Sequence, residues 1–60
     1  MKTRKIDKRT GEKCIRAAYE FEATASRLRA GGYDDIADGV AAAAEQLGDA
    51  GRALLDKLES

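Results

Sequence analysis

The side chains of this chain that could do chemistry are one thiol and several carboxylates, with no histidine to assist them. A cysteine nucleophile needs a neighbouring base or cation that lowers its pKa. Cys14 instead occupies a position in an apolar helical repeat, where a cysteine behaves as a small hydrophobic residue. We therefore expect Cys14 to pack in a core and not to react.

The densest group of carboxylates, Asp34, Asp35 and Asp38, directly follows a glycine pair. It lacks the ligand spacing of a calcium loop, and aspartates at a helix start serve as caps and interact with the helix dipole. A single cysteine without histidine cannot form a structural zinc site. The glycine pair is not part of a phosphate-binding G-x-x-x-x-G-K motif. The sequence predicts a protein that is not an enzyme and that carries neither metal nor cofactor.

Charge is distributed unevenly along the chain, although its net value is zero. Residues 1–16 contain seven Lys/Arg and two Asp/Glu, whereas residues 33–60 contain two Lys/Arg and seven Asp/Glu. Basic clusters of this kind contact nucleic-acid phosphates, and an aromatic ring beside them can stack on a base. The candidate nucleic-acid contacts are Arg4, Lys5, Lys8, Arg9, Lys13, Arg16 and Tyr19. Alternatively, the basic side chains are neutralised by Asp49, Asp56 and Glu59 near the other end of the chain.

Two helices must position these side chains. Residues 1–10 are predicted to form a basic arm, and residues 11–60 a helical hairpin. The first helix is expected at about 12–30, with Thr10 as its N-cap, Glu12 near the dipole and an ion pair between Glu12 and Arg16. Its apolar residues are spaced four and three apart, at Cys14, Ala18, Phe21, Ala25 and Leu28.

The glycine pair Gly31-Gly32 is expected to end the first helix in a tight turn. The second helix is expected at about 35–58, with Asp34 and Asp35 as capping residues. Its main seam is Ile36, Val40, Ala43, Leu47, Ala50 and Leu54, and beside it runs a seam of small residues, Ala37, Ala41, Ala44, Gly48 and Gly51. Small residues let another helix approach closely, although a biased composition would also explain them.

Two seams on one helix form a wider apolar surface than a single partner helix can cover. We therefore predict an all-α fold in which two antiparallel hairpins form a homodimeric four-helix bundle. The same surface is suited to docking on another protein. The predicted partner or dimer interface is Ile36, Val40, Ala43, Ala44, Leu47, Gly48, Gly51 and Leu54.

Other features of the sequence bear on its location in the cell. The basic start is not followed by the apolar stretch of a signal peptide, and no segment reaches the ~20 apolar residues that span a bilayer. The lone cysteine is typical of a reducing compartment. We expect a soluble, cytoplasmic protein that does not bind a membrane.

In architecture the chain resembles the Rop family of plasmid copy-control proteins. Two helices, a tight turn and core layers that alternate alanine with leucine carry the resemblance, with faint local similarity at Ile15-Arg16 and at residues 44–47. The resemblance implies a dimeric four-helix bundle that binds paired RNA hairpins through its first helices, here through Lys13, Arg16 and Tyr19. Glu20, Glu22 and the Gly31-Gly32 turn depart from that pattern.

Short chains without catalytic groups commonly act by binding, and many are encoded by phages or plasmids. Our leading hypothesis is therefore a small, dimeric protein-interaction module that regulates or inhibits a larger protein. The alternative is a Rop-like dimeric RNA-binding regulator that uses the basic arm and the first helix.

Overall fold

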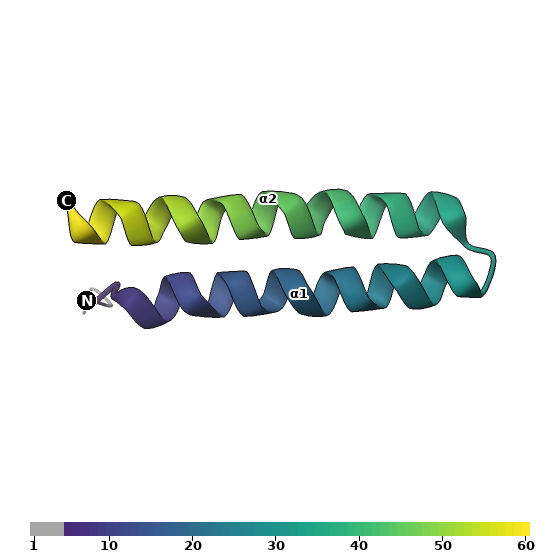
Figure 1. Cartoon of the computed structure of the whole chain (residues 1–60), viewed down its shortest axis with the longest axis horizontal. Helices are drawn as coiled ribbons and strands as arrows, with labels where there is room; N and C mark the ends of the chain where they lie inside the picture. The colour runs from purple at the N-terminus through teal and green to yellow at the C-terminus, as the bar shows by residue number, and fades with distance from the viewer. Residues whose placement is uncertain (1–4) are drawn as a thin grey trace, which may run out of the picture.

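The chain is an antiparallel hairpin of two long helices (Figure 1), as the sequence predicts. The computed structural model describes residues 5–60, and these form α1 (Lys8–Ala30) and α2 (Asp34–Glu59) without any strand. The hairpin brings the start of α1 and the end of α2 to one end of the molecule (Figure 1). Neither helix is long and apolar enough to cross a membrane.

Helix α1 begins at Lys8, four residues before the predicted start. The N-cap is Asp7, whose extended backbone lets its carboxylate accept a hydrogen bond of 3.1 Å from the Arg9 amide. Thr10 therefore does not cap the helix, and Glu12 lies beyond the first turn, which holds no acidic residue. Of the predicted arm, residues 8–10 are helical and residues 1–4 lie outside the described part of the chain.

The glycine pair ends α1 as predicted. Gly32 has a φ of +92°, and this left-handed conformation lets the Gly32 amide donate to the Arg29 carbonyl and the Tyr33 amide to the Leu28 carbonyl. Helix α2 then starts at once. Asp34 and Asp35 lie in its first turn, where the dipole favours them, but the N-cap residue is Tyr33 and it makes no side-chain capping bond. The prediction that the two aspartates cap α2 is wrong.

Small residues form the contact between the helices. The buried positions of α1 recur every seven residues, at Gly11, Ala18 and Ala25. Those of α2 are Ala37, Ala44, Gly48 and Gly51. The alanine–glycine seam of α2 is therefore the one that packs against α1, and no large side chain of the described residues is fully buried.

Among the glycines, Gly11 of α1 and Gly51 of α2 mark the closest approach of the two helix backbones. A Cβ atom on Gly51 would lie 2.9 Å from the Gly11 carbonyl oxygen and 2.9 Å from Cγ1 of Ile15. A Cβ atom on Gly11 would lie 2.8 Å from two carbon atoms of the Leu55 side chain. At Gly51 a larger residue would meet backbone and push the helices apart, which explains why glycine occupies the interior of α2 at this point.

Candidate interaction surfaces

One side of the hairpin carries apolar residues from both helices. With 100° between successive residues, one flank of the α1–α2 contact carries Cys14, Ala17, Phe21 and Leu28 of α1. On α2 the same geometry gives Ile36, Val40, Ala43, Leu47, Ala50 and Leu54. Phe21, Ala43, Leu47 and Ala50 border one shallow hollow together with Gln46, so these flanks of the two helices lie on the same side of the hairpin. We call these ten residues the apolar face.

The side chains of the apolar face are poorly covered. Ile36 is 58% exposed and Phe21 is 42% exposed, while Val40, Leu47 and Leu54 are half-buried. No charged residue occupies a helical position within this face. The residues predicted as a partner or dimer interface therefore divide into two groups. Ala44, Gly48 and Gly51 are buried against α1, whereas Ile36, Val40, Ala43, Leu47 and Leu54 remain accessible to another molecule.

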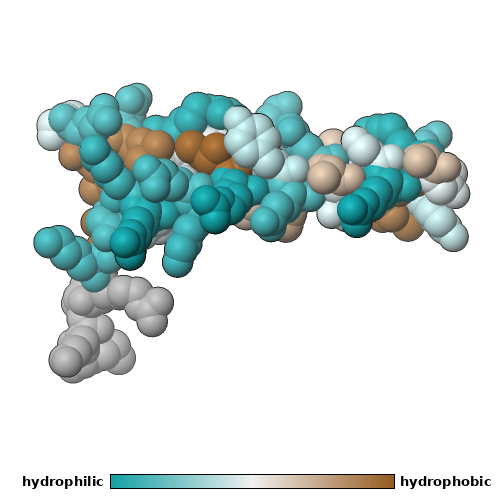
Figure 2. All heavy atoms as spheres, turned by 60° about the horizontal axis from the view of Figure 1, so that its bottom comes forward, coloured by the Kyte–Doolittle hydropathy of each residue, from teal (hydrophilic) through white to brown (hydrophobic). Residues whose placement is uncertain are grey.

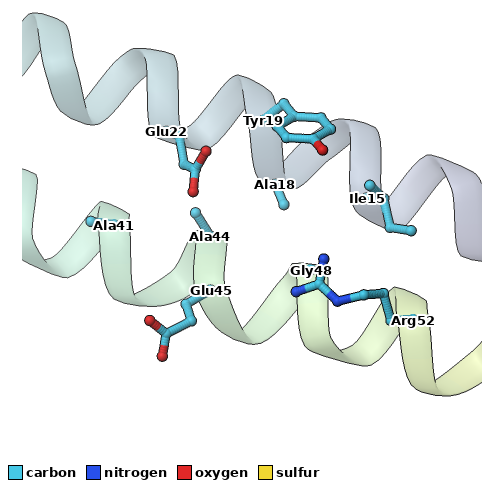
Figure 3. Close-up of a pocket in the computed structure, with 9 residues that line it drawn as sticks. All are labelled: Ile15, Ala18, Tyr19, Glu22, Ala41, Ala44, Glu45, Gly48 and Arg52. Atoms are coloured by element: carbon cyan, nitrogen blue, oxygen red, sulfur yellow. The ribbon is translucent and has the colours of Figure 1, made fainter.

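The opposite side of the hairpin holds a shallow groove between the helices (Figure 3). The groove has a volume of about 270 Å³, and its floor is formed by the small residues Ala18, Ala44 and Gly48. Its walls are Ile15, Tyr19, Glu22, Ala41, Glu45 and Arg52. We call it the Tyr19 groove.

Polar groups surround the Tyr19 groove. The Glu22 carboxylate points toward α2, and the Arg52 guanidinium extends over Gly48 (Figure 3). Arg52 also donates to Asp49 at 3.0 Å. Tyr19 is 66% exposed. The structure thus brings Tyr19 together with Glu22, Glu45 and Arg52 around one groove, whereas the basic side chains of α1 line a separate hollow. These glutamates were not predicted as site residues, although each lies beside an apolar seam in the sequence.

The outer side of α1 carries the basic residues. Arg9, Lys13 and Arg16 line a shallow hollow together with Glu12, and this surface is hydrophilic toward the end where the termini lie (Figure 2). Lys5 and Lys8 are also exposed, whereas Arg4 lies outside the described residues. We call Arg9, Lys13 and Arg16 the basic patch.

Ion pairs do not neutralise the basic patch within residues 5–60. The ion pairs of this part of the chain join Arg29 to Asp38 at 2.9 Å and Arg52 to Asp49 at 3.0 Å. The expected Glu12–Arg16 pair is not among them, nor is a pair between the start of α1 and the acidic end of α2. Both observed pairs are solvent-exposed, and such pairs stabilise a protein by at most about 1 kcal/mol.

Cys14 lies beside the helix contact and is half-buried. The Cβ position of Gly51 would lie 3.0 Å from the Cβ atom of Cys14, which places the cysteine against α2. Among residues 5–60, no group of three Cys, Asp or Glu side chains is placed to hold a metal ion.

No protein-family model matches the chain, and neither a curated protein nor a solved structure is significantly similar to it.

Proposed function

We propose that this chain is a small, non-enzymatic interaction module that works as a homodimeric four-helix bundle and regulates or inhibits a larger protein. The observation that carries the proposal is the apolar face, which extends over both helices without a charged side chain. Continuous apolar surface of this extent marks an interface in proteins that remain in water.

The thin interior of the hairpin supports the dimer. Its fully covered hydrophobic residues are alanines, namely Ala18, Ala25, Ala37 and Ala44. A chain of 60 residues is marginally stable even with a normal core, and this one has neither a disulfide nor a large buried side chain within the described residues. Burial of a large apolar side chain contributes about 1.5–3 kcal/mol, so pairing of two apolar faces supplies what one hairpin lacks.

The Tyr19 groove is the surface that we propose for the larger protein, because it stays exposed when two apolar faces pair. Glu22 and Glu45 flank the groove and enter none of the ion pairs of the described residues. Their charge favours a partner segment that carries lysine or arginine. An exposed tyrosine with an apolar ring and a polar hydroxyl is typical of protein-binding surfaces.

The dimer is tested by sedimentation of the 6.4 kDa chain at micromolar concentration. We expect twice the chain mass, and Val40→Asp should give a monomer because a charge would be buried in the interface. Ala42→Asp is the matched control, since Ala42 is exposed on the outer side of α2 and its substitution should leave the dimer intact. A folded wild-type monomer would refute the dimer.

The docking site is tested with a double variant, Glu22→Lys with Glu45→Lys, that should remain dimeric. If the wild type captures a partner protein from the native host, the lysine variant should not bind that partner. The variant with Glu22→Gln and Glu45→Gln should bind it more weakly than the wild type does. Equal binding of the same purified partner by the wild type and by the lysine variant would exclude the Tyr19 groove.

A second candidate function, a Rop-like dimeric RNA-binding regulator, is favoured by the basic patch. Arg9, Lys13 and Arg16 are exposed on one side of α1 and make no ion pair with any described residue. If they contact RNA phosphates, affinity should fall steeply with salt concentration, and Lys13→Gln or Arg16→Gln should each reduce the salt slope by about 1. Absence of binding to structured RNA at low salt would exclude this function.

A further inference from the structure

The two ends of the hairpin differ in charge. The turn half, residues 19–46, carries six acidic and two basic side chains. The open half, residues 5–18 and 47–60, carries seven basic and five acidic side chains. Because the hairpin places residues 5–18 beside residues 47–60 (Figure 1), the net charge is +2 at the open half and −4 at the turn half.

Two hairpins can pair their apolar faces symmetrically in two ways. If both turns lie at the same end, α1 faces α2 of the partner, and halves of like charge lie together. If the turns lie at opposite ends, α1 faces α1 of the partner and α2 faces α2. Each acidic turn half then lies over the basic open half of the other copy. Coulomb attraction favours the second arrangement and repulsion disfavours the first.

We propose that a second copy of this chain covers the apolar face with its turn at the opposite end, so that α1 lies on α1 and α2 lies on α2. This proposal rests on the dimer of the proposed function and specifies how its two copies are oriented. The chain is neutral as a whole but divided in charge along its length, which makes it complementary to a reversed copy of itself.

The area of the apolar face is sufficient for a stable dimer. Helix α2 has 26 residues and is therefore about 39 Å long. Two adjacent helices are roughly 20 Å wide. Pairing would bury on the order of 800 Å² on each copy, which is the size of a standard stable protein interface.

The same arrangement explains the position of Phe21. Helix α1 spans Lys8–Ala30, so Phe21 lies two residues from its midpoint, close to where the two-fold axis crosses the helix. The Phe21 rings of the two copies would then lie near each other at the centre of the interface, where large aromatic residues contribute most to binding. In the other orientation each Phe21 would face α2 of the partner.

Distances between spin labels distinguish the two orientations. Cys14→Ala removes the native thiol, and Tyr33→Cys then places one label at the turn of each copy, where Tyr33 is exposed. With the turns at opposite ends, the two labels should be about 40 Å apart, the length of a helix. With the turns at the same end, they should be within roughly 20 Å, the width of two adjacent helices. Sedimentation must first show that each labelled protein is a dimer.

A label near the middle of α2 serves as the matched control. Ala42→Cys in the same background should give a short distance in either orientation, because residue 42 is close to mid-length and is exposed on the outer side of α2, away from the apolar face. A long distance at position 33 with a short one at position 42 supports the proposal. Short distances at both positions overturn the orientation and leave the dimer standing, whereas a monomer in sedimentation overturns the dimer itself.

Salt provides an independent measurement on the wild-type chain. Opposite charges that lie together are screened as salt rises, so the dimer dissociation constant should increase several-fold between low and high salt. A dissociation constant that falls with added salt would indicate like charges in proximity and would contradict the arrangement with the turns at opposite ends.

Discussion

The inner and outer seams of α2 divide its apolar residues by size. The inner seam, which faces α1, buries Ala37, Ala44, Gly48 and Gly51, whereas the outer seam carries Ile36, Val40, Leu47 and Leu54. In a self-sufficient small domain the large residues would be inside. Here the chain uses small residues to close the hairpin and leaves the large residues for a second interface.

Of the substitutions that distinguish the two seams, the one expected to reduce stability most lies on the apolar face. Phe21→Ala should destabilise the dimer by about 3 kcal/mol per chain, because truncation of a buried phenylalanine costs about 3–5 kcal/mol and Phe21 is 42% exposed in one hairpin. Thermal or urea unfolding at a fixed protein concentration measures the loss. Tyr19→Ala, on the opposite side, is the control and should cost under about 1 kcal/mol. Equal effects of the two substitutions would mean that the apolar face is not buried.

The inner seam is broken most directly by Gly51→Ala. The new methyl group would lie 2.9 Å from the Gly11 carbonyl oxygen, a backbone atom that cannot move aside without displacement of α1. Overpacking of this kind costs about 1–3 kcal/mol, which exceeds the gain of about 1 kcal/mol in helix propensity. Equilibrium unfolding should show a net loss of stability. A more stable Gly51→Ala variant would show that the helices do not approach so closely.

Gly39→Ala is the matched substitution outside both seams. A Cβ atom at Gly39 has no neighbour within 4 Å, so the variant should gain the helix propensity of alanine, about 1 kcal/mol, without a steric penalty. The same unfolding experiment checks it, and a loss of stability would indicate a contact at Gly39. Nothing in the structure explains glycine at this position.

The smallest change is expected at Gly48, which lies in the inner seam between these two cases. A methyl group there would be 3.6 Å from the Cβ atom of Ala18 and 3.4 Å from an Arg52 nitrogen that can move. Gly48→Ala should therefore shift stability by less than about 1 kcal/mol in either direction. A loss as large as that of Gly51→Ala would mean that the close approach of the helices extends along the whole seam.

The sequence predicts the hairpin well and its interior poorly. Four-three spacing and Gly31-Gly32 are local signals, and both helices and the turn follow from them. Which seam of α2 packs inside depends on the distance between the helices, since the seams are neighbours around the helix. Asp7 was missed because Thr10 is also a good N-cap residue. Tyr19 was assigned to the basic side because it lies one helical turn from Arg16. It lies equally one turn from Glu22, and the sequence alone does not decide which of the two shares a groove with the ring.

The meeting of Gly11 and Gly51 also has a consequence for the order in which the chain folds. These glycines are 40 residues apart in sequence, whereas Ala25 and Ala37, buried near the turn, are 12 apart. The longer loop costs about 1 kcal/mol more in closure entropy. We therefore expect the contacts between the helices to form first near the turn and last near the chain ends. Amide hydrogens near Gly11 and Gly51 should then exchange with solvent before those near the turn.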